Sequence, residues 1–317
     1  MNDILFTFPG QGAQAAGMLH ELAESVPCRT RFDEAGEALG EDILSLDTEE
    51  ALQRTRAVQL CLLVAGVISS DWFLRRGVVP DFVSGLSIGA FPAAVAAGAL
   101  TFPDAVRLVA LRGELMERAY PSGYGLSSIG GLPQKEVEKL VDTVCTTGQA
   151  VYLANLNATD QFVIAGSKEA MQLVLQKACE KGATRVETLS VAVPSHCPLL
   201  NEAAQTLLQA ARQISFKRPA IAYLSGSTGR VLWQPERIAD DLVFNMARPV
   251  RWADAMTAAG ERGVRLIVEM PPGSVLTGLA RRVMAAGEAV SCQQVGFETV
   301  SRLARRLKET CKRSESV

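Results

Sequence analysis

The sequence predicts an α/β protein with a largely parallel sheet, because apolar β-rich runs alternate with helical patterns along most of its 317 residues. Three runs are typical of buried strands, namely ILFTF (4–8), DFVSG (81–85) and VRLIVEM (264–270). Each run leads into a turn that contains glycine, and a helical pattern follows. Further helices are expected over 55–75 and 104–120.

The middle of the chain has a different pattern and predicts a second, smaller domain. Its expected elements are SSIGGL, a helix over 134–144, VYLANLN, QFVIAG, a helix over 168–181 and a closing strand over 184–193. The order strand–helix–strand–strand–helix–strand is that of a ferredoxin-like α+β fold. We therefore expect a large α/β domain formed by 1–122 and 194–317, with the small domain inserted at 123–193. A frayed tail is expected from about residue 309.

Composition and charge argue against several functional classes. Lys plus Arg number 32 and Asp plus Glu 34, so the net charge is −2 and no nucleic-acid partner is expected. The apolar stretch 88–102 is shorter than the ~20 residues of a membrane helix and contains Pro92 and Gly98, so no membrane partner is expected. The start MNDILFTF lacks a basic signal region. The seven cysteines form no CxxC pair, which predicts reduced thiols in a cytoplasmic protein and no metal site.

Ser87 is the first candidate for chemistry, because GLSIG (85–89) fits the G-x-S-x-G nucleophile elbow between a predicted strand and a predicted helix. Glycines on both sides let the strand turn sharply, so the serine hydroxyl projects beside a helix N-terminus that stabilises an anion. A serine at this position also occurs as an ordinary N-cap. The motif alone leaves both interpretations open.

The supply of histidine favours the nucleophile. A serine needs a general base within hydrogen-bond reach, and the chain has only two histidines. His20 lies in GMLHELAE, a stretch typical of a helix surface. His196 lies in VPSHCPLL, after a strand and before a helix, where loop residues commonly carry chemistry. We expect a pair formed by Ser87 and His196.

Arg112 interrupts the apolar face of the helix expected over 104–120. Apolar residues recur there at helical spacing, and Arg112 falls in the centre of that stripe. A buried guanidinium is costly unless it is paired, and its shape suits a carboxylate. Two interpretations remain open at this point, an internal ion pair and a site for a substrate carboxylate.

The turn PGQG (9–12) follows the first predicted strand and provides a second wall for an anion site. Its glycines allow backbone N–H groups to approach a ligand, and we expect the N–H groups of Gln11 and Ile88 to form an oxyanion hole. A turn of this composition also occurs without any function. Its interpretation therefore depends on the neighbouring motifs.

Together these motifs resemble the malonyl-CoA:acyl-carrier-protein transacylase family, in order and spacing along nearly the whole chain. The matching segments are FPGQGAQ (8–14), GLSIGA (85–90), LVALRGELM (108–116), PSGYGLSSI (121–129), NLNATDQFVIAG (155–166), VPSHC (193–197), NMARPVRW (245–252) and PPGSVLTGL (271–279). The resemblance implies a large α/β-hydrolase-like domain with a parallel sheet plus a small ferredoxin-like one. This agrees with the fold predicted from the pattern.

The resemblance also implies roles for individual residues. Ser87 corresponds to the acylated nucleophile and His196 to its general base and acid. Arg112 corresponds to the residue that binds the malonyl carboxylate. Gln11 and Ile88 offer their backbone N–H groups to the oxyanion.

Two further positions follow from the same resemblance. Asn245 stands where the family usually has the glutamine that orients the histidine, and because asparagine is shorter its backbone carbonyl is a candidate for that role. Gln59 matches a glutamine near the acyl pocket. No permanently bound cofactor is implied. Malonyl-CoA is the implied substrate, and a phosphopantetheine-type thiol of an acyl carrier protein is the implied acceptor.

Two more departures from the family pattern lie beside the serine. Leu86 stands where histidine is usual, and Ala90 stands where glutamate is usual. The GLSIGAF form resembles the epsilon subunit of bacterial malonate decarboxylase, which loads malonyl onto the carrier subunit of that enzyme. That carrier bears a phosphoribosyl-dephospho-CoA group. We therefore expect a malonyltransferase of this branch.

Three other functions stay open from the sequence. The first is the transacylase of fatty-acid or polyketide synthesis. The second is a serine thioesterase or hydrolase, although no Asp or Glu clearly completes a triad in the order Ser, acid, His. The third is a non-catalytic subunit of a complex, against which the joint presence of Ser87, His196 and Arg112 argues. Arg248 and Arg251, and also Arg281 and Arg282, are candidates for contact with an anionic group, and a solvated surface charge explains each of them equally well.

Overall fold

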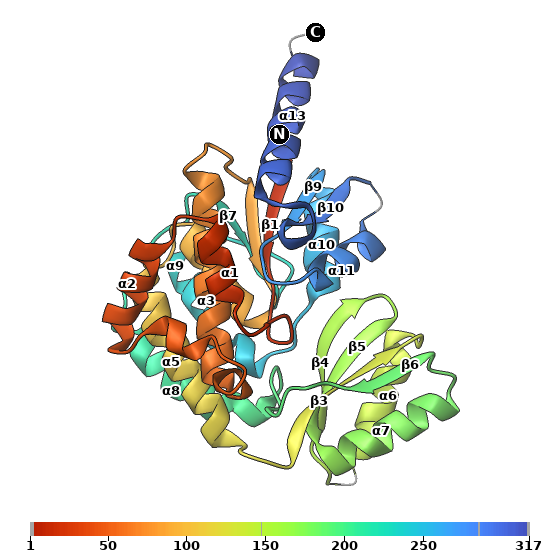
Figure 1. Cartoon of the computed structure of the whole chain (residues 1–317). Coiled ribbons are helices and arrows are strands. Elements are labelled where there is room, and N and C mark those ends of the chain that lie inside the picture. The colour runs from red at the N-terminus through yellow and green to blue at the C-terminus, as the bar shows by residue number, and fades with distance from the viewer. Residues whose placement is uncertain (1–2, 147, 285, 316–317) are drawn as a thin grey trace.

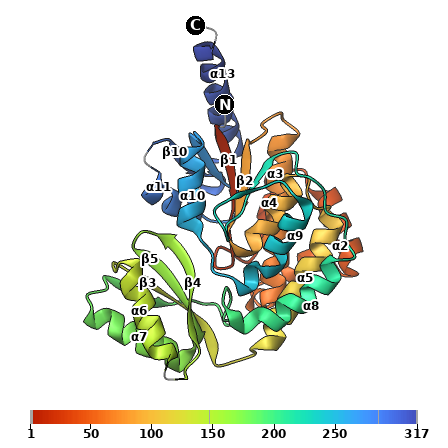
Figure 2. The ribbon, with the colours of Figure 1, turned by 180° about the vertical axis from the view of Figure 1, so that it is seen from behind.

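The computed structural model of the chain describes residues 3–146, 148–284 and 286–315, with side chains through residue 309 (Figure 1). This part contains one sheet of six strands and one of four. The four-stranded sheet and its helices lie to one side of the larger body, as the view from behind also shows (Figure 2). The predicted α/β fold with a parallel sheet is confirmed.

The six-stranded sheet has the order β10-β9-β1-β2-β7-β8, and all neighbours are parallel except the pair β7 and β8. Its strands are β1 (Ile4–Phe8), β2 (Phe82–Gly85), β7 (Ala222–Leu224), β8 (Val231–Leu232), β9 (Leu266–Glu269) and β10 (Glu288–Ser291). Successive residues of β1 enter different cores, since Phe6 and Phe8 belong to the larger core and Leu5 to a second one. A sheet buried on both faces explains why its strands are continuous apolar runs.

Helices cover both faces of this sheet. Those with residues in the larger core are α1 (Met18–Ser25), α2 (Arg29–Leu39), α3 (Thr55–Leu74), α4 (Ala90–Ala96), α5 (Phe102–Ala119), α8 (Asn201–Ala211), α9 (Pro235–Phe244), α12 (Cys292–Val295) and α13 (Phe297–Glu315). Those with residues in the second core are α10 (Trp252–Glu261) and α11 (Val275–Val283). Short 3-10 turns are η1 (Ile43–Leu46), η2 (Ala51–Gln53), η3 (Ser87–Gly89), η4 (Pro198–Leu200) and η5 (Asn245–Ala247).

The four-stranded sheet has the order β4-β5-β3-β6, with every neighbouring pair antiparallel. Its elements are β3 (Tyr124–Gly130), α6 (Gln134–Cys145), β4 (Val151–Ala158), β5 (Gln161–Ser167), α7 (Lys168–Glu180) and β6 (Arg185–Thr188). Both helices pack on one face of the sheet around a core of their own. Element order and strand order are those of a ferredoxin-like fold. All of these elements fall inside the predicted range 123–193.

Backbone hydrogen bonds join the small sheet to the large unit. The N–H of Leu156 in β4 donates to the carbonyl of Val250 at 2.8 Å, and the N–H of Val250 donates to the carbonyl of Ala154 at 2.8 Å. Val250 lies just before α10, so the small sheet is attached to the second face of the large one. This contact holds β4 beside the connection that follows η5.

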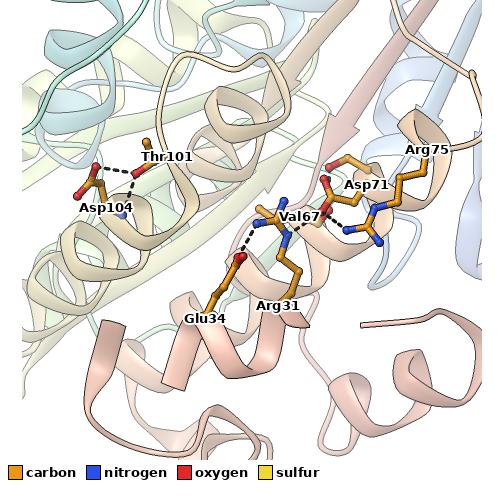
Figure 3. Close-up of polar contacts among 8 residues, drawn as sticks. Arg31, Glu34, Val67, Asp71, Arg75, Thr101 and Asp104 are labelled. Atoms are coloured by element: carbon orange, nitrogen blue, oxygen red, sulfur yellow. Dashed lines mark hydrogen bonds and ion pairs between the residues drawn. The ribbon is translucent and has the colours of Figure 1, made fainter. Parts of the chain in front are cut away.

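Helix α3 is the central helix of the larger core. By length and composition alone it would be able to cross a membrane, but 89% of its apolar window is buried inside the protein. Such burial is typical of a core helix. Near its end Asp71 accepts a hydrogen bond from the Nε of Arg31 at 2.7 Å, and Arg31 also donates to Glu34 at 2.6 Å (Figure 3). Helix α2 is thereby fixed against α3.

Helix α5 begins two residues before the predicted start and ends one residue before the predicted end. Thr101 is its N-cap, since its Oγ1 accepts from the N–H of Asp104 at 3.3 Å and donates to the Asp104 carboxylate at 2.6 Å (Figure 3). Pro103 follows in the first turn, where it costs no hydrogen bond. The segment TFPD thus has the residues that are typical of a helix N-terminus.

Three other boundaries differ from the prediction. Strand β9 is shorter than the expected 264–270. Strand β6 ends at Thr188, not at 193, because the chain then leaves the sheet to cross toward the segment that carries His196. The expected frayed tail from 309 is wrong, since α13 continues to Glu315, and the expectation for residues 316–317 lies outside the described residues. The start of α13 is anchored by Phe297, whose ring stacks on that of Phe73.

Candidate active site

Ser87 is the first residue of η3 and lies in the sharp turn that follows β2, at the carboxyl end of the sheet. Its φ is 57°, a left-handed conformation that non-glycine residues adopt rarely and that marks functional strain. A Cβ on Gly85 would lie 2.0 Å from the carbonyl carbon of Gly89, and a Cβ on Gly89 would lie 2.1 Å from the carbonyl oxygen of Phe8. Both glycines are therefore required sterically, and the turn has the geometry of a nucleophile elbow and not of a simple N-cap.

His196 lies opposite Ser87, and the predicted pair is present. Its Nε2 is 2.8 Å from the Ser87 Oγ, and its Nδ1 is 2.6 Å from the backbone carbonyl of Asn245. Because a carbonyl only accepts, Nδ1 carries the proton and Nε2 is free to accept one from the serine. His196 also has a positive φ of 65°, and its own N–H donates to the carbonyl of Met246 at 2.7 Å.

The surroundings keep His196 neutral. Burial and the nearby positive charge of Arg112 lower the pKa of His196 to about 4, although the hydrogen bond to Asn245 acts in the opposite direction. The imidazole is only 2% exposed. At neutral pH it is therefore in the form that a general base requires.

No carboxylate of the described residues orients His196. Buried Asp241 instead accepts from the Tyr223 hydroxyl and the Ser225 hydroxyl, each at 2.7 Å. Buried Glu269 accepts from the first turn of α11, including the N–H of Thr277 at 2.6 Å. Ser87 and His196 thus form a hydrogen-bonded pair, and the second nitrogen of His196 is held by a backbone carbonyl.

Arg112 reaches the same point from α5, and its burial is complete at 0% exposure. Its Nη1 donates to the Gln59 side-chain oxygen at 2.6 Å, and its Nη2 donates to the Asn245 side-chain oxygen at 3.0 Å. The same Nη2 lies 3.4 Å from the Ser87 Oγ. Among the described residues Arg112 forms no ion pair, and its Nε has no hydrogen-bond partner. The internal ion pair that the sequence left open is therefore not formed.

Burial lowers the pKa of Arg112 to about 9, because its charge is compensated only by neutral groups. Its partners are amide and hydroxyl oxygens, which satisfy hydrogen bonds but not the charge. A buried cation of this kind is expensive without an anion beside it. The arrangement leaves a positive charge beside Ser87 that the carboxylate of a ligand would compensate.

The predicted oxyanion donors lie beside the serine. Gln11 lines the same pocket as Ser87, and Ile88 follows Ser87 directly, with its side chain buried in the larger core. Among the hydrogen bonds between described residues, none uses the backbone N–H of Gln11 or of Ile88. Both donors thus remain available, and their role as an oxyanion hole stays a prediction.

These groups open into a pocket of about 650 Å³ that lies between the two sheets. The large unit contributes Ser87 and His196, and the small unit contributes Asn155 and Asn157 of β4. The side-chain oxygens of both asparagines are buried without a hydrogen-bond partner. The pocket therefore offers polar groups along one wall as well as a reactive end.

Three residues near the site had no role predicted from the sequence, namely Asn155, Asn157 and Met246. The sequence could have indicated the two asparagines, because N-x-N within a strand places both side chains on one face of the sheet. The carbonyl of Met246 had no such signal, since any residue supplies a backbone carbonyl. His20, the other histidine, lies at the surface. Its Nδ1 is 2.9 Å from the carboxylate of Asp47, and it has no contact with Ser87 among the described residues.

The arginines that the sequence singled out have partners of their own. Arg248 pairs with Asp240 at 2.5 Å, and Arg251 pairs with Asp254 at 2.6 Å. Arg281 donates to the carbonyl of Ala289 at 2.8 Å. Arg282 lies at the pocket and pairs with the Asp160 carboxylate, linking α11 to the turn between β4 and β5.

Comparison with known proteins identifies the class. Residues 5–308 match the acyl transferase domain family, so the chain belongs to the acyl transferase family. The malonyl CoA-acyl carrier protein transacylase of Bacillus subtilis (strain 168) is 37% identical over 288 residues, which cover 89% of this chain and 91% of that protein. The protein of the same name from Escherichia coli (strain K12) is 37% identical over 290 residues, covering 90% and 94%.

Solved structures agree with these relatives. FabD from Acinetobacter baumannii matches with a TM-score of 0.92 and 34% identity, over 96% of this chain and 99% of that chain. A malonyl-transacylase in complex with its type II PKS acyl-carrier protein matches with a TM-score of 0.88 and 34% identity, over 94% and 99%. The two-sheet architecture is therefore that of the malonyl-transacylases.

Proposed function

We propose that this protein transfers a malonyl group from malonyl-CoA to the thiol of an acyl carrier protein through a malonyl ester of Ser87. The observation that carries this proposal is the position of Arg112. A buried arginine without an ion-pair partner lies 3.4 Å from the Oγ that His196 is placed to activate. An acyl group that carries its own carboxylate would supply the negative charge that pairs with this arginine.

The first half of the reaction acylates the serine. The Nε2 of His196 takes the hydroxyl proton while Oγ attacks the thioester carbonyl. The negative charge on the carbonyl oxygen meets the N–H groups of Gln11 and Ile88, each contributing about 3–4 kcal/mol in comparable sites. The carbon–sulfur bond then breaks, and the CoA sulfur takes the proton from His196. The malonyl carboxylate lies against Arg112.

The second half runs in reverse with a different thiol. The carrier thiol gives its proton to Nε2 of His196 and attacks the malonyl ester carbonyl. The bond to Oγ breaks, and Ser87 recovers its proton from the imidazolium. The carbonyl of Asn245 keeps Nδ1 protonated throughout, so Nε2 serves as both base and acid in each half of the reaction.

Two carrier proteins are candidates for the acceptor of the malonyl group. Our main proposal is an acyl carrier protein of the type served by the transacylase relatives, whose names include that carrier. The sequence also resembles the epsilon subunit of malonate decarboxylase through Leu86 and Ala90, so the carrier subunit of that enzyme is the second candidate. Leu86 lines the pocket and Ala90 is buried.

We place the reaction in the cytoplasm. The six cysteines among the described residues are free, and thiols stay reduced in that compartment.

One experiment tests transfer against hydrolysis and compares the acceptors. The enzyme is mixed with malonyl-CoA alone, and malonyl bound to protein is followed over time. We expect a malonyl-enzyme that persists until a carrier thiol is added. Rapid release of free malonate without a carrier would instead indicate a thioesterase. Adding carriers with a phosphopantetheine or a phosphoribosyl-dephospho-CoA group in parallel then identifies the acceptor by its rate.

A further inference from the structure

Asn245 contacts all three groups of the site at once. Its backbone carbonyl accepts from Nδ1 of His196 at 2.6 Å. Its side-chain oxygen accepts from Nη2 of Arg112 at 3.0 Å, and its side-chain nitrogen donates to the backbone carbonyl of Ser87 at 3.3 Å. The residue is 3% exposed, so these contacts are shielded from water.

The backbone and the side chain of Asn245 therefore have separable tasks. Any residue at this position supplies the carbonyl to His196. The amide is different, because only a group of this length with one acceptor and one donor meets Arg112 and the Ser87 carbonyl together. Asparagine is one methylene shorter than the glutamine usual in the resembling family, so its amide is held closer to the backbone.

We infer that the Asn245 side chain is a positioning residue that sets acyl selectivity, because it orients Arg112 toward Ser87 while leaving the arginine charge uncompensated. The inference rests on the proposed function and adds to it a residue that determines specificity. Gln59 holds Nη1 in the same manner. The second N–H of Nη1 remains for the malonyl carboxylate, while the second N–H of Nη2 is directed at the Ser87 Oγ, 3.4 Å away.

The neutrality of this acceptor is the essential property. A carboxylate at the same place would form a buried ion pair with Arg112 and compete with the malonyl carboxylate for the guanidinium. An uncharged acyl group such as acetyl makes no use of that charge. The identity of residue 245 should therefore change the ratio of malonyl to acetyl transfer more than it changes acetyl transfer itself.

The test compares Asn245→Asp with Asn245→Ala and with a matched control. Asn245→Asp keeps the size and the acceptor but adds a charge, Asn245→Ala removes the amide, and both retain the backbone carbonyl that binds His196. Asn157→Asp adds the same charge to the pocket wall away from the contacts of Arg112. The readout is kcat/KM with malonyl-CoA divided by kcat/KM with acetyl-CoA, with one carrier as acceptor.

We expect Asn245→Asp to lower this ratio by about a hundred-fold and Asn245→Ala by about tenfold, the effect of lost hydrogen bonds to a charged group. Asn157→Asp should leave the ratio within about twofold of wild type. A ratio in Asn245→Asp equal to that of wild type, or a fall as large in Asn157→Asp, would overturn the inference. A role in stability alone would lower both rates together and leave the ratio unchanged, which overturns it as well.

A binding measurement separates this inference from the proposed function. Calorimetry with malonate as the probe needs no turnover, and we expect wild type to bind it and Asn245→Asp to bind it at least about tenfold more weakly. Equal binding overturns the inference even if malonyl transfer is found. Weaker binding to the variant, together with no transfer by wild type, would retain the role of Asn245 and reject the transferase. Failure of wild type to bind malonate would contradict the carboxylate receptor and this inference together.

Discussion

The two sheets contribute to one pocket in different ways. The parallel sheet and its helices provide Ser87, His196 and Arg112, each fixed by several contacts within the large unit. The antiparallel sheet provides a wall that includes Asn155 and Asn157, whose side-chain oxygens have no partner. The proposed bond-making groups thus all lie where the strands of the parallel sheet end, while the small unit lines the space in front of them.

Removing the reactive groups is the most severe way to test this division. Ser87→Ala and His196→Ala should each lower malonyl transfer by roughly a million-fold, as for other serine–histidine sites, with nearly the same loss in the double variant. Steady-state assays with malonyl-CoA and a carrier measure this. Circular dichroism and the melting temperature serve as controls for folding. Losses that multiply in the double variant would show that the two residues do not act as a unit.

Removing the charge of the receptor should have the next largest effect. Arg112→Ala leaves the malonyl carboxylate without its partner, which costs about 3 kcal/mol or more and corresponds to at least a hundred-fold in kcat/KM. Acetyl transfer should fall much less, because acetyl has no carboxylate. The same assay run with both thioesters measures the difference. An unchanged ratio of malonyl to acetyl transfer would exclude the carboxylate role of Arg112.

The pH dependence separates the two groups without any substitution. The pKa of His196 is lowered to about 4 and that of Arg112 to about 9. Because the base must be unprotonated and the receptor protonated, malonyl kcat/KM should fall tenfold per unit below about pH 4 and again above about pH 9. With acetyl-CoA the alkaline fall due to Arg112 should be absent. The profiles are corrected for uncatalysed thioester hydrolysis, and identical alkaline limbs for both substrates would contradict this assignment.

Substrate binding should itself alter the acid limb. Arg112 is one of the two causes that lower the pKa of His196, and pairing it with the malonyl carboxylate removes part of that effect. The pKa of His196 should therefore be higher in the malonyl complex than in the free enzyme. The acid limb of kcat, which reports the complex, should then lie at higher pH than that of kcat/KM. Acetyl-CoA, which leaves Arg112 unpaired, is the control.

The smallest effect is expected from the wall of the small unit. Asn157→Ala removes one polar group that has no partner within the protein, so a loss of about 1 kcal/mol or less, up to about fivefold in kcat/KM, is expected. Malonyl and acetyl transfer should fall equally, because the residue is not among the contacts of Arg112. A loss comparable to that of Ser87→Ala would show that the small unit takes part in the chemistry.

Much of this site could be predicted from the sequence, because short local patterns determine its main residues. The glycines beside Ser87 define the elbow, the scarcity of histidine selects His196, and helical periodicity exposes Arg112 as a charge on an apolar face. The possibility that the carbonyl of Asn245 binds His196 also agrees with the structure. Parallel strands and the ferredoxin-like order follow from alternation of elements in the same way.

Other features depend on contacts between distant segments and had no local signal. The side chain of Asn245 in η5 meets Arg112 of α5 only once the large unit has folded, because the two residues are 133 positions apart in the sequence. His196 has a positive φ and donates its N–H to the carbonyl of Met246, and no pattern in VPSHC indicates either feature. The early end of β6 has a similar cause, because the chain must leave the sheet to bring His196 to the serine.

The central claim is that the malonyl group is carried on Ser87 with its carboxylate on Arg112. The most direct measurement is peptide mapping by mass spectrometry after brief incubation with equal amounts of malonyl-CoA and acetyl-CoA. We predict that wild type carries malonyl on the peptide containing Ser87, that Arg112→Ala carries mainly acetyl there, and that Ser87→Ala carries neither. An adduct on another residue, or the same ratio of malonyl to acetyl in wild type and Arg112→Ala, would contradict the account.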